Sequence, residues 1–341
     1  MKKQQFERDK VTVVIPVYNE ERFLREALES VVEQVDCVII GDNASTDGTE
    51  AICREFVEKY SHIVYFRNEK NVGSAENFNL CYERVTTEFC FHMGGHDLVP
   101  ENYVAELKKT LSSCPESIAA FAPVREFYDD YPDNYRLFDL EIFRREIQND
   151  DPLVRAAHFF SEGNCSIVYG LFRSNVFCGE MRNFQPIAGC DVVFLFSALL
   201  RGKMVFSDNT FFLMRNVHAK LVGSESLSAS MERIVGEGRF QHAGYDLRPM
   251  IRAILSQVQK HVKNPSDDQK RYICALERRL FHRYDCISGD PRIDYPLYLK
   301  RANRLFLRPF EQIFRQLKFF LIPGYAKRYQ KRKNIFAGKK C

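Results

Sequence analysis

Polar side chains follow two short apolar runs near the start of the chain. The first run, Val11–Ile15, is followed by Tyr18, Asn19 and Glu20. The second run, Cys37–Ile40, is followed by Asp42, Asn43 and Asp47. If both runs are parallel strands of an open α/β sheet, their carboxyl ends border the crevice in which such sheets bind ligands. An aromatic ring and a short carboxylate at that edge can hold a planar, hydrogen-bonding ring such as a nucleobase. The pattern therefore predicts an enzyme that handles a nucleotide.

The segments around these residues alternate between strand and helix patterns. Apolar residues recur at helical spacing between the two runs, where we expect Asn19 as the N-cap. Further on we expect a helix at Ala51–Tyr60, a strand at Ile63–Phe66, a helix with Ser74 as its N-cap, and strands at Phe89–Met93, Val168–Arg173, Met204–Ser207 and Phe211–Arg215. Such alternation predicts βαβ units and a mostly parallel sheet.

Four spaced motifs together resemble the family 2 glycosyltransferases, which have the GT-A fold. The motifs are Ile15-Pro-Val-Tyr-Asn-Glu, Asp42-Asn-Ala-Ser-Thr-Asp-Gly-Thr, Asn71-Val-Gly and His96-Asp-Leu-Val-Pro. The resemblance covers roughly residues 11–105 and extends more loosely to about residue 220. It implies an inverting enzyme that transfers a sugar from a nucleotide sugar, UDP being favoured, to an acceptor hydroxyl with the help of a divalent metal.

The same resemblance implies a set of nucleotide-binding residues. They are Pro16, Val17, Tyr18, Glu20, Asp42, Asn71, Gly73, Asn77, Gly95 and His96. Val17 and Tyr18 are expected near the base, and Asp42 takes the position of the carboxylate that hydrogen-bonds the base. The alternative is that Asp42, Ser45 and Asp47 serve only the loop and the helix cap. We expect that structural role for Ser45 and Asp47, and ligand contact for Asp42.

The metal motif departs from the pattern of the family. Relatives carry Asp-x-Asp, often followed by another Asp, where this chain has Gly94-Gly-His-Asp. Departure of a nucleoside diphosphate builds negative charge on the diphosphate, which a bound metal ion stabilises. An imidazole among the ligands moves the preferred metal from Mg²⁺ toward Mn²⁺. The candidate metal ligands are Asp97, His96 and His218, the last of which ends an Arg-x-x-His motif. Alternatively, His96 contacts phosphate directly, or the His-Asp pair only caps the turn.

A later motif supplies the candidate catalytic base. Gly189-Cys190-Asp191, ahead of an apolar helix, resembles the (Glu/Asp)-Asp motif whose Asp is the base in the family. An inverting displacement needs one carboxylate within hydrogen-bond reach of the acceptor hydroxyl, and Asp191 is assigned that role. The alternative is a plain helix N-cap. For Arg215, contact with diphosphate and pairing with a surface acid both remain open.

Composition and missing motifs limit the function classes. The chain has 341 residues, 45% of them apolar, and eleven cysteines without a C-x-x-C pair. Neither a signal peptide nor an apolar run of roughly 18 residues is recognised, so we expect a cytoplasmic protein with reduced thiols. G-x-G-x-x-G, Walker A and G-x-S-x-G sequences are absent, which argues against dinucleotide oxidoreductases, P-loop NTPases and α/β hydrolases.

The charge of the chain is distributed unevenly. Residues 300–341 hold thirteen Lys or Arg and one acid, whereas the preceding 299 residues hold 36 basic and 44 acidic groups. Because aromatic and aliphatic residues alternate with the basic ones, this tail predicts an amphipathic helix on an anionic membrane surface, at the inner face of the membrane. The alternative is that the helix packs on the catalytic domain. The acidic body argues against nucleic acid as a partner.

The sequence thus predicts an α/β GT-A domain over residues 1–225 and a helical C-terminal region over residues 226–341. The predicted acceptor is a glycan or a lipid-linked glycan. Two other functions stay open. One is a nucleotide-sugar-binding scaffold without catalysis, and the other is a polyprenyl-phosphate glycosyl synthase, whose acceptor is a phosphate.

Overall fold

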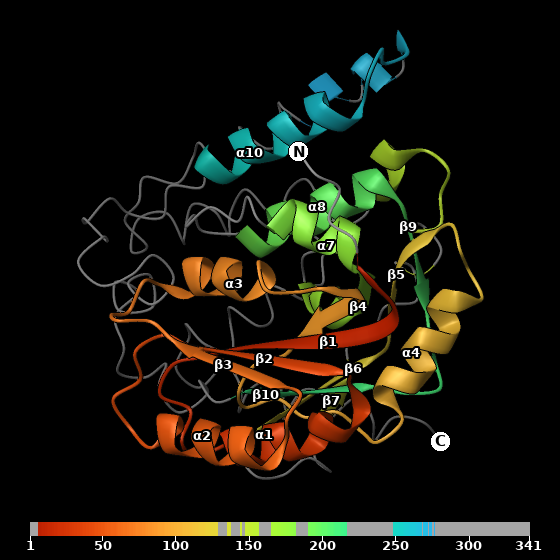
Figure 1. Ribbon diagram of the computed structural model, residues 1–341. Coiled ribbons are helices and arrows are strands. Elements are labelled where there is room, and N and C mark those ends of the chain that lie inside the picture. Colours follow the sequence, from red (N-terminus) through yellow and green to blue (C-terminus); the bar gives the residue numbers. More distant parts are fainter. Residues whose placement is uncertain are drawn as a thin grey trace, which may run out of the picture.

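The computed structural model describes residues 6–128, 135–137, 144, 147–156, 165–181, 190–216, 248–267, 269–271, 273–274 and 276. Within them a seven-stranded sheet has the order β3-β2-β1-β4-β8-β5-β9 (Figure 1). Its strands are β1 (Glu7–Val17), β2 (Cys37–Asp42), β3 (Ile63–Arg67), β4 (Thr87–His92), β5 (Ser117–Phe121), β8 (Leu171–Arg173) and β9 (Lys203–Phe206). A three-stranded sheet combines β10 (Phe212–Asn216), β6 (Val124–Tyr128) and β7 (Tyr135–Leu137).

The first four strands are parallel, as the sequence predicts. β1 pairs with β2 from Thr12↔Cys37 to Val17↔Asp42, and β4 lies on its other side. The short strand β8 is the antiparallel exception, paired with both β4 and β5. Because β1 is covered on both faces of the sheet, Val11–Ile15 is an almost unbroken apolar run rather than an alternating one.

Helices cover both faces of the large sheet. One face carries α1 (Leu24–Val31), α2 (Thr49–Lys59) and α4 (Tyr103–Ser112), and the other carries α3 (Ser74–Tyr82), α7 (Ser174–Met181) and α8 (Cys190–Arg201) (Figure 1). In α1, Leu24, Ala27, Leu28 and Val31 are buried, which is the helical spacing of a core-facing stripe. The α/β arrangement expected from the sequence, a mostly parallel sheet between helices, is therefore confirmed.

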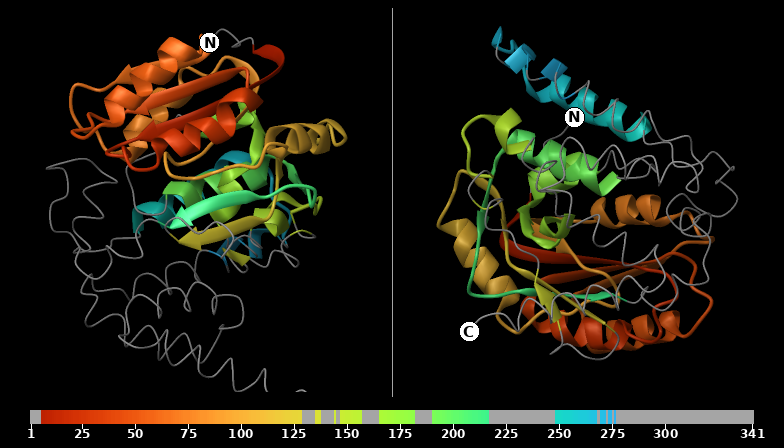
Figure 2. Two further views of the ribbon diagram at one scale, coloured as in Figure 1. Left: turned by 90° about the horizontal axis from the view of Figure 1, so that it is seen from below. Right: turned by 180° about the vertical axis from the view of Figure 1, so that it is seen from behind.

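A further helix forms an outer layer over α8. This helix, α10 (Arg248–His261), packs Ile251, Ile254 and Val258 into the same apolar core as α8, and the right view of Figure 2 shows it alongside that helix. Residues 217–247 and 277–341 lie outside the described residues. The boundary at residue 225 and the basic tail therefore stay predictions. In the part of the chain described, no helix is both long and apolar enough to cross a membrane.

Two of the predicted helix N-caps and the bounds of one predicted strand are wrong. α1 begins at Leu24 with Phe23 as its N-cap, because Asn19 has a positive φ of 56° and its side chain instead accepts a hydrogen bond from the Thr46 N–H. α3 is capped by Gly73, whose φ of 88° suits glycine, so Ser74 is already helical. The expected strand Val168–Arg173 divides into a 3₁₀ turn, η2 (Cys165–Tyr169), and β8.

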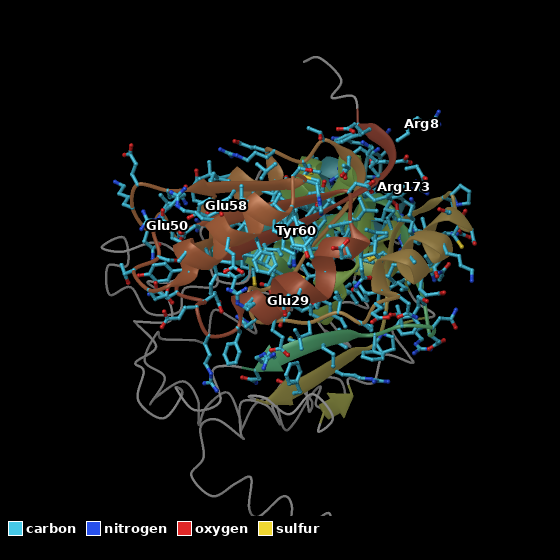
Figure 3. All side chains as sticks on the ribbon, turned by 60° about the horizontal axis from the view of Figure 1, so that its bottom comes forward. Arg8, Glu29, Glu50, Glu58, Tyr60 and Arg173 are labelled. Atoms are coloured by element: carbon cyan, nitrogen blue, oxygen red, sulfur yellow. The ribbon has the colours of Figure 1, made fainter. Side chains whose placement is uncertain are left out.

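The outer surfaces of α1 and α2 are charged and are joined by an ion pair. Figure 3 shows Glu29 and Glu58 on these helices, and the Arg25 guanidinium binds both carboxylate oxygens of Glu55 at 2.7 and 2.6 Å. Both side chains are about half exposed, so this pair contributes little to stability. The helices are held on the sheet mainly by their apolar faces.

A close approach of α3 to β2 yields a first prediction. A Cβ at Gly41 would clash with the Cys81 Sγ atom and would lie 2.8 Å from the Phe66 ring. We therefore expect Gly41→Ala to lower the free energy of unfolding by about 1–3 kcal/mol, measured by urea denaturation. Adding Cys81→Ala makes room for the methyl group, so the double variant is expected to regain part of the loss. A Gly41→Ala variant as stable as the wild type would contradict this packing.

Candidate functional site

Three parallel strands end side by side at one edge of the large sheet. The register places Val17 beside Asp42, and Asp42 beside Arg67. Backbone hydrogen bonds continue past the strand ends, from the Asn43 N–H to the Val17 carbonyl (2.9 Å) and from the Asn68 N–H to the Asp42 carbonyl (2.8 Å). Tyr18, the next residue of the chain after β1, is 38% exposed. The expected ligand edge is therefore present, with Asp42 at its centre.

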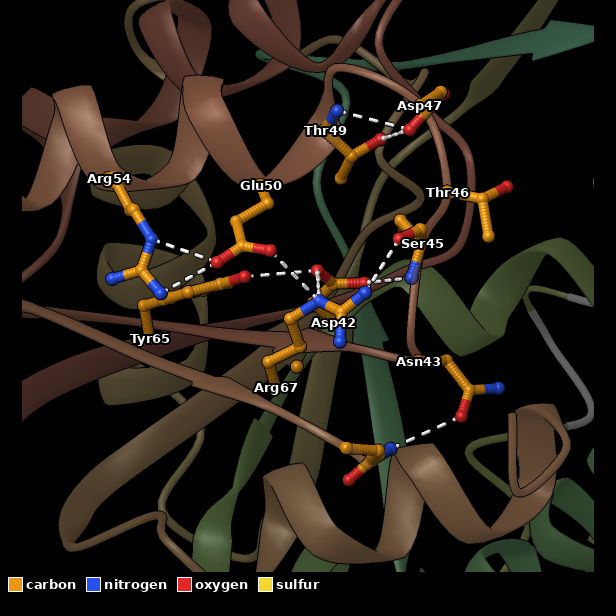
Figure 4. A network of polar contacts seen from close by, with 12 residues as sticks. Asp42, Asn43, Ser45, Thr46, Asp47, Thr49, Glu50, Arg54, Tyr65 and Arg67 are labelled. Carbon is orange, nitrogen blue, oxygen red and sulfur yellow. Dashed lines mark hydrogen bonds and ion pairs between the residues drawn. The ribbon is translucent and has the colours of Figure 1, made fainter. Parts of the chain in front are cut away.

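The Asp42 carboxylate is completely buried and is bound from three directions (Figure 4). Its oxygens accept hydrogen bonds from the Ser45 N–H at 2.8 Å and the Tyr65 hydroxyl at 2.9 Å, and the Arg67 Nε atom lies 3.3 Å away. Burial and the hydrogen bond to Asp42 raise the pKa of Tyr65, so its phenol stays protonated as a donor. Since a buried charge needs partners, this network is what allows a carboxylate at this position.

Arg67 connects Asp42 to the beginning of α2. Its Nε atom lies 3.1 Å from Glu50, and its Nη2 atom donates to the Ser45 carbonyl at 2.7 Å. We did not predict Tyr65 or Arg67 as site residues from the sequence. They could have been predicted in the same way as Tyr18 and Asp42, from their position at the carboxyl end of a parallel strand. The end of Ile63–Arg67 lies at the same edge of the sheet.

Four asparagine side chains support the loops beside this edge. Asn43 donates to the Asn71 Oδ1 atom (2.8 Å) and accepts from the Val72 N–H (2.9 Å), while Asn77 donates to the Gly41 carbonyl (2.7 Å). Asn68 donates to both Asn43 and Asn77. Two of the predicted nucleotide-binding residues thus fix this region: Asn71, before α3, binds Asn43 just after β2, and Asn77, within α3, binds Gly41 of β2. Their predicted contact with a nucleotide stays a prediction.

Asp47 and Ser45 have the structural roles expected of them. Asp47 accepts hydrogen bonds from the Thr49 N–H at 3.0 Å and the Thr49 hydroxyl at 2.6 Å, at the first turn of α2. Burial opposes ionisation of Asp47, but these bonds and one from the Glu21 N–H outweigh it and lower the pKa. The Ser45 hydroxyl accepts from the Asn19 N–H at 3.0 Å.

A second group of predicted residues meets where β4 ends. Here a turn, Gly94–Asp97, lies against the end of β1: a Cβ at Gly95 would come within 3.0 Å of the Val17 and Glu20 side chains. Pro16 pairs with Gly41 in the strand register, next to Val17. The structure therefore brings Val17, Glu20, Gly95, His96 and Asp97 together, on the side of β1 away from β3.

His96 is held by Glu20. Its Nδ1 atom lies 2.9 Å from the Glu20 Oε1 atom. Burial alone would lower the pKa of His96, but the hydrogen bond with Glu20 and the negative charges of Asp97 and Glu20 raise it to about 9. The ring is therefore an imidazolium at neutral pH.

Asp97 is enclosed in the turn. Its side chain accepts hydrogen bonds from the Gly94 N–H (2.8 Å) and from the Arg215 N–H of β10 (3.0 Å). Burial raises the pKa of Asp97, against the opposing effects of His96 and these two bonds. The carboxylate thus joins the turn to a strand 118 residues away.

The structure shows one of the two roles left open for Arg215, pairing with an acid, and contact with diphosphate stays a prediction. Its guanidinium binds Glu26 of α1 at 2.5 Å and the His96 carbonyl at 2.8 Å, and it lies over the Phe23 ring. Since Glu26 is about half exposed, Arg215 pairs with a surface acid, and it does so while almost wholly buried itself.

The described residues do not fit the expected divalent cation. No group of three or more His, Cys, Asp or Glu side chains in the described ranges is arranged to hold a metal. Asp97 is 1% exposed and bound by two N–H groups, and His96 supplies one ring. The third candidate, His218, lies outside the described residues.

Asp191 lies in the first turn of α8 and is half buried. Within the described residues, no hydrogen bond or ion pair joins its carboxylate to another side chain or to the Gly94–Asp97 turn. Burial, and then the charge of Asp191, raise the pKa of the neighbouring Cys190 to about 12. The preceding Gly189 lies outside the described residues, so the role of Asp191 as base stays a prediction.

Comparison with known proteins relates the fold to a class of protein and residues 12–173 to a family. The fold and the strand-end site define an α/β protein of the GT-A type, and residues 12–173 match the sequence model of "Glycosyl transferase family 2". Residues 12–173 are therefore similar to a family 2 glycosyltransferase domain. The resemblance of the motifs is thereby confirmed.

Named glycosyltransferases are among the relatives of this chain. The chain is 32% identical over 115 residues to glycosyltransferase GlyA of Streptococcus pneumoniae, covering 33% of this chain and 16% of that protein. It is 34% identical over 109 residues to abequosyltransferase RfbV of Salmonella typhimurium, covering 30% of this chain and 33% of that protein. It therefore spans a third or less of the length of these relatives.

The fold is similar to that of Staphylococcus aureus TarS, residues 1–349. In complex with UDP-GlcNAc, that structure aligns with a TM-score of 0.60 and 16% identity, covering 85% of this chain and 79% of TarS 1–349. At this identity the likeness supports the GT-A fold.

The Glu20–His96 pair yields a pH prediction. The folded-state pKa of His96, about 9, lies above its ordinary value of 6.5. The stabilisation is therefore complete below pH 6.5 and is lost as the pH rises through 9. We expect Glu20→Gln to flatten this part of the stability–pH curve, measured by urea unfolding.

The imidazole protons of His96, followed by NMR, test the same pair directly. Glu20→Gln is expected to lower the titration midpoint of His96 by about one unit or more, since it removes a carboxylate at hydrogen-bond distance. Glu29→Gln, an exposed change on α1, is the control. Unchanged titration of His96 in the Glu20→Gln variant would contradict the role of Glu20.

Proposed function

We propose that this chain transfers a sugar from a nucleotide sugar to a hydroxyl of a glycan or lipid-linked acceptor, with inversion at the anomeric carbon. The observation that carries the proposal is the buried Asp42 carboxylate at the shared edge of β1, β2 and β3, beside the exposed Tyr18. The family 2 domain over residues 12–173 supports it independently.

We favour a uracil nucleotide for this edge. Uracil presents an N–H donor between two carbonyl acceptors, and Asp42 supplies an acceptor next to the Arg67 guanidinium donor. On entry, the N–H of the base replaces the Tyr65 hydroxyl as a donor to Asp42, and the Arg67 guanidinium donates to a carbonyl of the base. The structure of TarS with UDP-GlcNAc, whose fold is similar, supports the same nucleotide.

The transfer itself is a single displacement. Asp191 takes the proton of the acceptor hydroxyl, whose oxygen forms a bond to the anomeric carbon as the bond from that carbon to the diphosphate breaks. The electron pair of the broken bond leaves with the nucleoside diphosphate. We derive no step through a divalent cation, since the described donor set does not fit one. The preference for Mn²⁺ over Mg²⁺ stays a prediction of the sequence.

A binding protein without catalysis is the second candidate. It is favoured by the turn Gly94–Asp97, in which the carboxylates of the family's metal motif are reduced to the buried Asp97. Transfer to any acceptor excludes it. A polyprenyl-phosphate synthase differs only in its acceptor, and phosphate in the product linkage distinguishes it. Membrane attachment through residues 300–341 stays a prediction, because that tail lies outside the described residues.

Asp191→Asn tests the proposed base. We expect kcat to fall about 10²–10⁴-fold, because the amide cannot take the proton, while the Kd of the donor stays nearly unchanged. Product formation and donor calorimetry measure the two effects separately. Asp208→Asn, which alters an exposed carboxylate paired with Arg144, is the matched control. Full activity in the Asp191 variant would remove it from the base role.

Tyr65→Phe tests the proposed base site at Asp42, because it is expected to lower stability without lowering UDP affinity. Loss of the hydroxyl removes one hydrogen bond from Asp42, so the free energy of unfolding is expected to fall by about 1 kcal/mol. UDP affinity is expected to stay equal or to increase, because the base no longer competes with this phenol for Asp42. Urea unfolding and calorimetry with UDP measure both quantities. Weakened UDP binding would contradict the proposed exchange of contacts.

A further inference from the structure

The turn Gly94–Asp97 is the segment at which the family resemblance expects a divalent cation. Its carboxylate, Asp97, is turned away from solvent, and each oxygen accepts one backbone N–H, from Gly94 and from Arg215. A cation that drew Asp97 out of these bonds would leave the part-buried Gly94 N–H and the buried Arg215 N–H without their acceptor, which costs free energy. Asp97 is therefore poorly suited to ligate a metal.

The two bonds of Asp97 belong to a larger connection between the turn and β10. Leu98 and Leu213 exchange backbone hydrogen bonds in both directions, at 2.9 and 3.0 Å. The Arg215 Nε atom donates to the His96 carbonyl at 2.8 Å. The side chain of Asp97 thus extends a backbone pairing beyond the bridge at Leu98, which explains its burial without a metal.

The packing of the turn also leaves little space for a second carboxylate. An ideal Cβ at Gly94 would lie 2.8 Å from the Asp97 Oδ2 atom and 3.2 Å from the His96 Nε2 atom. The partly exposed side chain in the turn is the His96 ring, 22% exposed and held by Glu20. One imidazole is a poor substitute for the several oxygen ligands that Mg²⁺ needs, and within the described residues this turn offers Mn²⁺ one ligand.

We propose that this chain binds the diphosphate of its nucleotide sugar without a divalent cation at the turn Gly94–Asp97, where Asp97 is a positioning residue that ties the turn to β10. The His96 ring, partly exposed and fixed by Glu20, faces the phosphate oxygens in place of the cation. This inference rests on the proposed function for its ligand, a nucleoside diphosphate.

Metal and UDP titrations of the full chain test the inference. Free Mn²⁺ is followed by electron paramagnetic resonance with UDP alone and with UDP plus protein, and UDP affinity is measured by calorimetry in EDTA and in MnCl₂. We expect the protein to add no Mn²⁺ binding at this turn, and the Kd of UDP to agree within about threefold between the two buffers. Greater tightening by Mn²⁺, or Mn²⁺ binding that Asp97→Asn abolishes, would overturn the inference.

Thermal unfolding of Asp97→Asn distinguishes a positioning role from a metal ligand. The variant is expected to unfold at a lower temperature than the wild type by the same interval in EDTA and in MnCl₂, because the lost contacts are to backbone N–H groups. Asp267→Asn, an exposed change, is the control. A variant that matches the wild type in EDTA and loses only a stabilisation by Mn²⁺ would contradict the role.

The outcomes separate this inference from the proposed function. If UDP binds in neither buffer, the proposed function fails, while the Mn²⁺ titration and the melting of Asp97→Asn still decide the role of the turn. If Asp97→Asn does not fold, the Mn²⁺ titration of the wild type decides it.

Discussion

The buried carboxylate of Asp42, at the edge shared by three parallel strands, is the interaction on which the candidate site depends. A carboxylate without solvent must be paired and hydrogen-bonded, and Asp42 meets that requirement through Ser45, Tyr65 and Arg67. These partners come from the loop after β2 and from β3, so satisfying one charge fixes the relative positions of both. The register of β1 then places Val17 and Tyr18 next to this arrangement.

The edge has two parts, and the end of β1 joins them. On one side Asp42 and the asparagine-supported loop present hydrogen-bonding groups suited to a base. On the other side Glu20 holds His96 in the turn after β4, and Asp97 and Arg215 fix that turn to β10. In the proposed function, a nucleotide sugar lies across the end of β1 with its base at Asp42 and its diphosphate at His96. This order gives the two halves of the edge their separate functions in the proposed reaction.

Most of the central fold could be predicted, because local patterns determine it. The apolar runs of β1 and β2 and the helical spacing in α1 are visible within short windows, and parallel strand ends then imply the site at Asp42. The helix caps could not be predicted in the same way, since the spacing of apolar residues does not show that Asn19 and Gly73 have a positive φ. The partners of Asp97 could not be read locally, because the Arg215 N–H reaches it from a strand 118 residues later. Tyr65 and Arg67 could have been found from their place at a strand end.

The most direct test of the central claim, that this edge binds a nucleotide sugar, is thermal unfolding of the full chain with UDP-, GDP- and dTDP-sugars in EDTA. A ligand at about 100 times its Kd stabilises the folded state by about 2.7 kcal/mol, which a melting curve detects. The account predicts a higher unfolding temperature with a UDP-sugar, and loss of that shift when Asp42 is replaced by asparagine. An unfolding temperature unchanged by all three classes of nucleotide sugar would contradict it.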